Sequence, residues 1–265
     1  MTDDLQVALE AFSNRIRRVF NDELIGIYLT GSVALGSYHD GKSDVDFTVL
    51  VESPLSDEYF KPLTDVHEEL ALVFPRVKFE GHYVSKDDLG RQPEEIEPVF
   101  AIHDNKLSRS HHDINTVTWF TLKKHGITVW GFPSNELDLS ISSEELSAYV
   151  IGNVNSYWAK WLSDTKAPFS VKWFAARQSG AVEWGIMGIC RMFYTLSEHD
   201  VLSKDNAARY ALTRVPDRYK RILKEAISIR TGQGERQYDS PLVRMSDMIE
   251  FMEYMIHECN GLYTV

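Results

Sequence analysis

The sequence has few cysteines and no long apolar run, and each absence excludes a class of protein. Its only two cysteines, Cys190 and Cys259, do not form a C-x-x-C pair, so we expect buried, reduced thiols rather than a disulfide. The N-terminal stretch MTDDLQVALEAF lacks a basic region followed by an apolar run, so we expect no export signal. No apolar stretch approaches the ~18 residues that a membrane span needs. These absences predict a soluble, cytoplasmic protein without a membrane partner.

The chain also lacks an excess of basic charge. Its 265 residues carry 39 acidic against 28 basic side chains, a formal net charge of −11. Because an acidic surface repels polyphosphate backbones, we expect no nucleic-acid partner, whereas metal ions or polyamine-like cations would be attracted. With 43% hydrophobic and 12% aromatic residues, the composition is that of a folded protein whose length fits one large or two modest domains.

Hydrophobic periodicity indicates a mixed first half. Apolar residues at helical spacing predict a helix over 4–20, and short apolar runs bounded by polar turns predict strands. The elements expected after this first helix are strands at 24–30, 44–51 and 77–84, helices at 56–73 and 113–125, and a short apolar run, ITVW, at 127–130. This order is that of an α/β or α+β core.

Beyond a turn-rich stretch at 131–140, the pattern becomes almost entirely helical. Ser142 and Glu145 form the Ser-x-x-Glu signature of a helix start. Helices are expected near 143–163, 180–198, 203–212, 217–230 and 241–258. We therefore predict an α+β protein with two domains, a mixed-sheet domain over 1–141 and an all-α helical bundle over 142–265.

The strongest chemical signal is the segment GSVALGSYHDGKSDVDFTVLV, which begins at Gly31. Asp44 and Asp46 lie two residues apart on an expected strand, so their carboxylates project from the same face. Two like charges held together repel unless a cation lies between them, and magnesium prefers such hard oxygen ligands. Gly31 and Ser32 end the preceding strand, where free N–H groups and a hydroxyl form a suitable cradle for a polyphosphate.

A third carboxylate, Glu80, lies in the strand VKFEGHYV, where it shares one face with Lys78 and His82. If this strand is adjacent to the D-x-D strand, Glu80 comes within reach of the aspartates, which is the arrangement of two-metal sites for nucleotidyl transfer. A lone D-x-D in a strand is often exposed or salt-bridged, and only the combination of these features is specific. Asp87 and Asp113 are the next candidates for the third acid.

The spacing G-S-x(11)-D-x-D resembles the signature of the polymerase-β-type nucleotidyltransferase superfamily, over roughly residues 24–84. The resemblance implies that Asp44 and Asp46 hold metal ions, two Mg²⁺, and that Gly31 and Ser32 contact the phosphates of ATP. It also implies that Glu80 completes the metal site and is the candidate general base. Residues 1–141 then form a nucleotidyltransferase domain.

The second half resembles the helical domain of bacterial aminoglycoside adenylyltransferases of the streptomycin/spectinomycin class, mainly over 185–230, and 112–131 resembles the corresponding helix and strand. Lys204 lies in the first turn of a helix capped by Ser203, where the macrodipole disfavours a cation unless it meets an anion. Arg191 lies on a largely apolar helix and needs an acid or a phosphate as partner. The resemblance implies that Arg191 and Lys204 contact the ATP phosphates, which makes 142–265 a substrate- and ATP-binding domain. Structural salt bridges are the alternative.

The chain departs from this class just before the Arg191 helix, where acidic and aromatic side chains hold streptomycin. Ala181 and Val182 stand near the expected acids. The candidates to replace them are Glu183, Asp164, Trp161 and Trp173.

Three histidines, His103, His111 and His112, lie close together in the sequence. They have neither the i, i+4 helical spacing nor the cysteines of a zinc site. We therefore expect a polar loop rather than a zinc centre.

The prediction for function is a magnesium-dependent transfer of AMP from ATP to a hydroxyl of a cationic aminoglycoside, such as streptomycin or spectinomycin. One alternative is a nucleotidyltransferase that modifies another small molecule, a protein or an RNA end, although the acidic balance argues against RNA. A second is a non-catalytic nucleotide-binding regulator, which would have no need of three carboxylates. The sequence leaves the modified hydroxyl, the nucleotide preference and the oligomeric state open.

Overall fold

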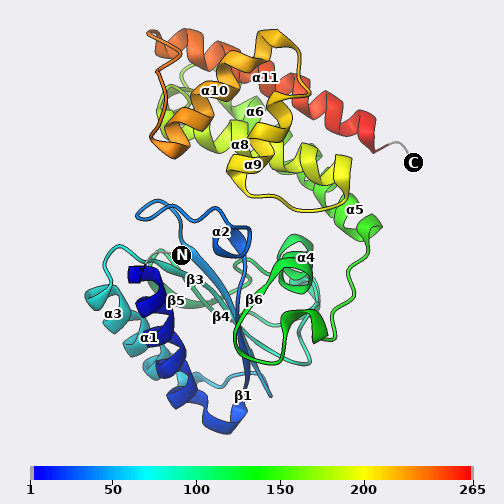
Figure 1. The fold of residues 1–265 in the computed structure, drawn as a ribbon. Coiled ribbons are helices and arrows are strands. Elements are labelled where there is room, and N and C mark those ends of the chain that lie inside the picture. Colours follow the sequence, from blue (N-terminus) through cyan, green and yellow to red (C-terminus); the bar gives the residue numbers. More distant parts are fainter. Residues whose placement is uncertain (1–2, 264–265) are drawn as a thin grey trace. The chain divides into compact units, whose positions relative to one another are not determined.

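The computed structural model describes residues 3–263, which belong to two compact units, Met1–Ile141 and Ser142–Val265 (Figure 1). The first unit is a mixed sheet with helices and the second is helical, so the predicted α+β class is confirmed. Among residues 3–263, no helix combines the length and the apolar character that crossing a bilayer requires.

The first unit is built on a six-stranded sheet with the order β5-β4-β3-β2-β1-β6. The strands are β1 (Leu24–Leu29), β2 (Val45–Val51), β3 (Phe79–Ser85), β4 (Val99–His103), β5 (Lys106–Ser110) and β6 (Ile127–Gly131). β2 and β3 pair in parallel, and the other neighbours in this sheet pair antiparallel. A parallel pair needs a crossover connection, which α3 (Phe60–Val73) provides.

The two faces of the sheet are covered by different helices, as Figure 1 shows. α1 (Asp3–Phe20) and α3 pack on the face that carries Phe47 and Val49 of β2. α4 (Thr116–His125) packs on the opposite face, where Trp119 meets a core that includes Leu50. Because side chains alternate along a strand, Asp46 and Glu80 project from the face of α4. The short segments of this unit are α2 (Gly31–Ala34) and the 3₁₀ turns Asn21–Glu23, Asp57–Tyr59, Pro93–Glu95 and Ser134–Glu136.

Several element boundaries differ from the prediction. β2 begins at Val45, so Asp44 immediately precedes the strand instead of starting it. α4 begins at Thr116, because the side chain of Asn115 caps it by accepting a hydrogen bond from the Thr118 N–H at 3.1 Å. The prediction missed β4 and β5, which form a hairpin around Asp104 and Asn105, both with positive φ.

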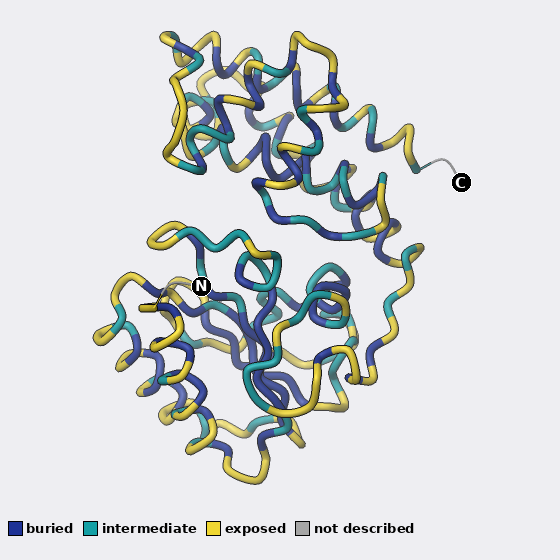
Figure 2. The backbone as a smooth tube through the Cα atoms, viewed as in Figure 1, coloured by how far each residue is buried: buried dark blue, intermediate teal, exposed yellow. Residues whose placement is uncertain are grey.

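The second unit is a bundle around α8. Its helices are α5 (Ser143–Asn153), α6 (Ala159–Lys166), α7 (Val171–Ala175), α8 (Ser179–Glu198), α9 (Lys204–Leu212), α10 (Asp217–Thr231) and α11 (Pro241–Leu262), with a π-helical segment, Val154–Trp158, between α5 and α6. α8 packs against α9, α10 and α11, and its residues are mostly buried or half-buried, as the dark blue and teal tube in Figure 2 shows. The predicted capping box is present, since Glu145 N–H donates to Ser142 Oγ and Ser142 N–H donates to the Glu145 carboxylate. Cys190 and Cys259 are buried free thiols, as expected.

Candidate active site

Asp46 and Glu80 are register partners on the parallel strands β2 and β3. Every other residue of these two strands is buried, so the two carboxylates are the only partly accessible side chains there. Asp44 immediately precedes β2. The strand adjacency that the sequence required for a three-carboxylate site is therefore present, at the amino-terminal ends of the parallel pair.

The turn formed by Gly31 and Ser32 lies directly against this pair. Gly31 has a φ of +54°, and a Cβ atom there would overlap Oδ2 of Asp46. The backbone N–H of Ser32 donates to the Asp46 carboxylate, and the N–H of Thr30 donates to the Asp46 carbonyl at 2.9 Å. Ser32 Oγ donates to the carbonyl of Asp44 at 3.4 Å. The turn predicted to contact phosphates thus also fixes the aspartates.

The site concentrates negative charge. Burial, together with the charges of Asp113, Asp44 and Glu80, raises the pKa of Asp46 to about 7, although the hydrogen bond from the Ser32 N–H acts in the opposite direction. A carboxyl group with such a pKa is poorly stabilised as an anion by the protein alone. A divalent cation would supply the missing positive charge, and the donors are the hard oxygens that magnesium prefers. The residues present therefore fit a magnesium site.

Asp113 is a fourth acid at this place. It lies in the loop before α4 with a φ of 57°, and its effect on Asp46 is the largest of the neighbouring charges. Burial acts to raise the pKa of Asp113, but its interaction with His112 and the charges of His82 and His103 lower it on balance. The sequence offered Asp113 only as a substitute for Glu80. Its contribution depends on the path of the loop over the sheet, which periodicity does not reveal.

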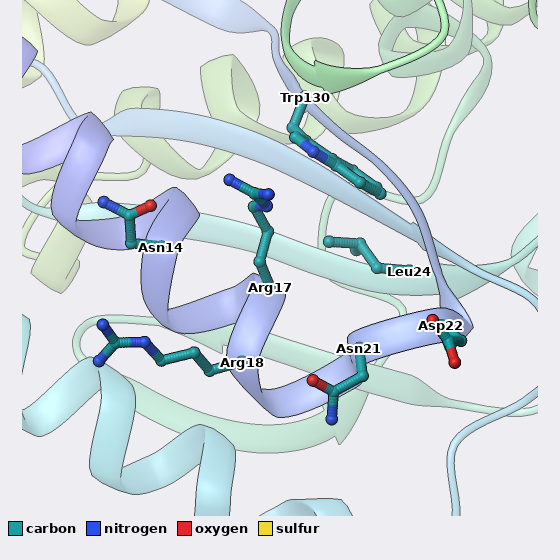
Figure 3. Close-up of a pocket in the computed structure, with 7 residues that line it drawn as sticks. All are labelled: Asn14, Arg17, Arg18, Asn21, Asp22, Leu24 and Trp130. Carbon is teal, nitrogen blue, oxygen red and sulfur yellow. The ribbon is translucent and has the colours of Figure 1, made fainter.

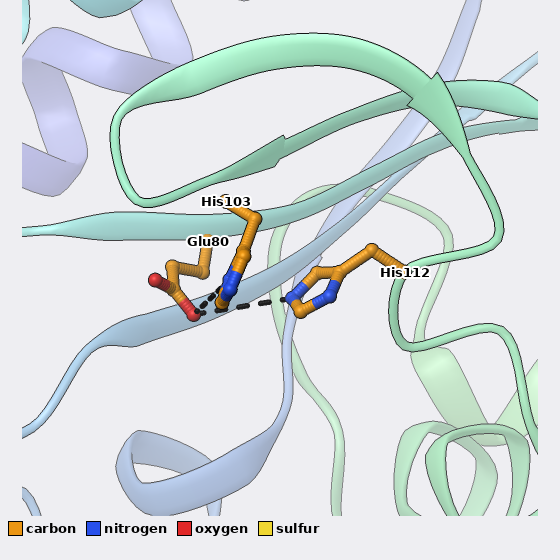
Figure 4. Close-up of side chains that lie close together, drawn as sticks. All are labelled: Glu80, His103 and His112. Carbon is orange, nitrogen blue, oxygen red and sulfur yellow. Dashed lines mark ion pairs between the residues drawn. The ribbon is translucent and has the colours of Figure 1, made fainter.

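Two histidines converge on Glu80, as Figure 4 shows. Nδ1 of His103 lies 3.3 Å from Glu80 Oε2, and Nε2 of His112 lies 3.9 Å from the same oxygen. The backbone N–H of Asp104 donates to Glu80 Oε1 at 3.3 Å. His111 is directed elsewhere, with Nε2 3.0 Å from the carbonyl of Ile96.

The expectation of a polar loop is wrong for His103, which is the last residue of β4, whereas His112 lies in the loop between β5 and α4. The missed hairpin explains the error. Ile102 of β4 pairs with Gly81 of β3, which brings the end of β4 beside the start of β3.

A buried histidine lies beneath the acids. Nε2 of His82 is 3.1 Å from Thr48 Oγ1, and its ring meets Trp119 edge-on at 5.4 Å. Desolvation lowers the pKa of His82 to about 4, so this ring is neutral at physiological pH. Lys78, expected on the same face, lies before β3 and is exposed.

Arg191 and Lys204 lie in the helical unit. Arg191 is half-buried on α8, and Lys204 is the first residue of α9, whose cap Ser203 accepts from the Asn206 N–H at 3.3 Å. The Lys204 ammonium lies 5.1 Å from the ring centre of Trp184, which is 47% exposed. The predicted helix start with its adjacent lysine is therefore present.

The acids expected to replace the missing streptomycin ligands already have basic partners. Glu183 lies 3.1 Å from Arg230. Asp164 pairs with Lys172 at 2.8 Å and with Lys160 at 3.1 Å. These ion pairs stabilise the helical unit, and both carboxylates are already neutralised by basic side chains of that unit.

The aromatic candidates for the same role also have contacts within the helical unit. Trp173 stacks on the guanidinium of Arg177, 3.6 Å from the ring centre. Trp161 packs against Gly185.

A separate pocket of about 410 Å³ lies on the α1 side of the sheet. In Figure 3, Arg17 reaches toward Trp130 of β6, with 5.5 Å between the guanidinium and the ring centre. The residues that line it are Asn14, Arg17, Arg18, Asn21, Asp22, Leu24 and Trp130. None of them is a predicted site residue, so the pocket is distinct from the carboxylates.

Comparisons with known proteins match a different family model to a part of each unit. Residues 9–111 match the family model of a nucleotidyltransferase domain, and residues 172–258 match the aminoglycoside adenylyltransferase C-terminal domain. The spectinomycin 9-adenylyltransferase of Campylobacter jejuni is 20% identical over 256 residues, which cover 91% of each chain. The crystal structure of a spectinomycin adenyltransferase from Enterococcus faecialis, solved with ATP and spectinomycin, superposes with a TM-score of 0.68 at 14% identity. That match covers 94% of this chain and 99% of the other, and it shows a shared fold.

Proposed function

Since this chain is a nucleotidyltransferase that resembles the bacterial aminoglycoside adenylyltransferases, we propose that it transfers AMP from ATP to a hydroxyl group of a cationic aminocyclitol antibiotic. The observation that carries the proposal is the pairing of Asp46 with Glu80 across two parallel strands, beside the Gly31–Ser32 turn. Within a domain of this family, that arrangement supports in-line nucleotidyl transfer.

Spectinomycin is the acceptor we propose first. The relatives compared above are named for spectinomycin. Ala181 and Val182 stand where the streptomycin class is expected to carry acids, and Glu183 is already paired with Arg230. A doubly guanidinylated ligand would lack its carboxylate partners there, so streptomycin is the second choice.

We propose Asp44, Asp46 and Glu80 as the residues that hold two magnesium ions, with Asp113 adding negative charge nearby. Bound magnesium neutralises the charge that develops on the α-phosphate and on the departing pyrophosphate. The Gly31–Ser32 turn holds the aspartates in place and offers the Ser32 hydroxyl to the triphosphate.

The acceptor oxygen forms a bond to the α-phosphorus of ATP while the bond from this phosphorus to the bridging oxygen breaks and pyrophosphate leaves. Glu80 takes the proton of the attacking hydroxyl on its carboxylate. Arg191 and Lys204 offset the negative charge of the triphosphate. Positioning and fixed charges account for most of the acceleration in such a transfer.

Pyrophosphate release from magnesium–ATP tests the proposal, with mass spectrometry of the acceptor to identify the adenylylated product. We expect release with spectinomycin and little without an acceptor. Release only with an RNA end or a protein would support a different acceptor class. Nucleotide binding without any release across the acceptor panel would support a regulatory module and would overturn the proposal.

A further inference from the structure

The three side chains Glu80, His103 and His112 offer one carboxylate oxygen and two imidazole nitrogens to a common point. They come from β3, from the end of β4 and from the loop between β5 and α4. The three donor atoms lie within 4.8 Å of one another, and the two rings are 4.1 Å apart between centres. Figure 4 shows both rings directed at the same carboxylate.

The hydrogen bonding of this group is incomplete. Nε2 of His112 is buried and makes no hydrogen bond of normal geometry within the described residues, although Asp113 lies 3.2 Å away. Nε2 of His103 faces Asp104 at 3.5 Å while Nδ1 faces Glu80. When Nε2 of His103 carries the proton, the Nδ1 lone pair points at the carboxylate oxygen of Glu80. A cation between these two atoms removes their repulsion.

The spacing agrees with a small metal ion. Tetrahedral ligands at the zinc distances of about 2.0–2.2 Å lie about 3.3–3.6 Å from one another. The nitrogen–oxygen separation from His103 to Glu80, 3.3 Å, falls in this range, and that from His112, 3.9 Å, is slightly longer. Three protein ligands leave an open position for water. Imidazole nitrogens favour zinc-type ions over magnesium, so this ligand set differs in preference from the all-oxygen set of Asp44 and Asp46.

We propose that Glu80, His103 and His112 form a binding site for a transition-metal ion of the zinc type, which shares Glu80 with the proposed magnesium site but does not include Asp44 or Asp46. Asp104 faces Nε2 of His103, the nitrogen that does not face Glu80, and so acts as the outer partner that orients this metal-bound histidine. Asp113 lies 3.2 Å from Nε2 of His112, the ligand nitrogen itself, and adds negative charge beside the ion. Because Glu80 is shared, a bound zinc ion occupies the carboxylate that serves as base, and zinc therefore inhibits transfer. This consequence rests on the proposed function, whereas the binding site does not.

Metal titration of the full, untagged and chelator-treated chain tests the site without nucleotide. Zinc binding is measured by calorimetry, and cobalt binding by its visible absorption. We expect one equivalent of each ion in the wild type. Loss of a residue that only supports a metal ligand typically weakens metal binding roughly 10- to 100-fold. His103→Asn and His112→Asn each remove a ligand itself, so each should weaken zinc and cobalt binding by at least this factor.

His111→Asn is the matched control, because this neighbouring histidine is directed at the Ile96 carbonyl, and it should bind as the wild type does. Asp46→Asn should also retain the zinc and cobalt signals. Thermal unfolding without metal shows which variants are folded. One folded variant, either His103→Asn or His112→Asn, is sufficient for the test. No binding by the wild type, or unchanged affinity in a folded His103 or His112 variant, overturns the proposal.

Zinc inhibition of pyrophosphate release is the second readout. We expect zinc to inhibit the wild type. The zinc concentration that inhibits His103→Asn should be at least tenfold higher, in line with the roughly 10- to 100-fold loss of affinity. If the chain releases no pyrophosphate with any acceptor, the proposed function fails while the titration still decides the metal site.

Discussion

The backbone of Gly31 lies against the carboxylate of Asp46, where a side chain on residue 31 would overlap Oδ2. Gly31 also has a φ of +54°, a conformation that costs an L-residue about 1–2 kcal/mol. Two requirements therefore coincide at this glycine, one conformational and one steric. Gly36 has the first alone, because its φ is +67° and a Cβ atom there would meet no atom of the described residues within 4 Å.

This difference gives a matched pair of variants. Gly31→Ala should displace Asp46 and reduce kcat/KM by on the order of 100-fold, as expected for a misplaced catalytic group. Gly36→Ala should lose about 1–2 kcal/mol of stability from strain with nearly normal turnover. Steady-state pyrophosphate release and urea unfolding measure the two effects. Equal activity losses in both variants would contradict a specific role for the contact with Asp46.

Asp46→Asn should abolish transfer and leave the fold intact. Because the neighbouring acids repel the Asp46 carboxylate, we expect the melting temperature of the variant without magnesium to equal or exceed that of the wild type. Magnesium should stabilise the wild type more than the variant. Thermal unfolding with and without magnesium, together with turnover, checks this. Activity above a tenth of the wild type would rule out the metal assignment.

Glu80→Gln should lower turnover by about 10² to 10⁴, the usual contribution of a general base, while ATP affinity changes much less. The amide keeps the shape of the side chain and removes the proton acceptor. Single-turnover rates and nucleotide titration separate the two quantities. If turnover is normal, Asp113→Asn is the next variant, since Asp113 has the largest effect on Asp46 among the neighbouring charges.

The stability of the first unit should depend on pH through His67. This ring is 7% exposed and lies 2.7 Å from Tyr83 Oη, and desolvation lowers its pKa from 6.5 to about 4. Between these values the unfolded chain binds the extra proton, so stability falls as pH falls from 6.5 to 4. The loss should approach about 3 kcal/mol, given about 1.4 kcal/mol per pKa unit.

Urea unfolding at pH 7, 5.5 and 4.5 measures this dependence. His67→Gln should be less stable than the wild type at pH 7, with the difference shrinking toward pH 4. Other titrating groups are common to both proteins and cancel in the comparison. A difference that stays constant over this range would show that the His67 pKa is not lowered.

The ion pair of Glu183 with Arg230 predicts a structural effect of mutation in the helical unit. Arg230 is buried, and Glu183→Gln removes one of its acidic partners while Asp205 remains 3.4 Å away. The variant should therefore cost about 1–3 kcal/mol, with little change in spectinomycin affinity. Glu253, paired with Lys166 at the surface, provides the control: Glu253→Gln should stay within about 0.5 kcal/mol of the wild type. Calorimetric titration measures the spectinomycin affinity of Glu183→Gln. If this variant lost spectinomycin binding but kept its stability, Glu183 would contact the acceptor directly.

The D-x-D pair, its distance from the Gly–Ser turn and the Ser142 capping box could be recognised in the sequence, because each depends on residues close together along the chain. The helices of the second half were also predicted well, since helical periodicity is a local signal. The resemblance of the two halves to known families followed from the same segments.

The tertiary structure alone decided which side chains surround these motifs. Residues 46 and 80 became neighbours through the register of β2 and β3, and His103 reached Glu80 through pairing of β4 with β3. Glu183 pairs with Arg230, which lies 47 residues further along the chain. Strand pairing and ion pairing join residues distant in sequence, and their choice depends on burial and register across the whole unit rather than on any local pattern.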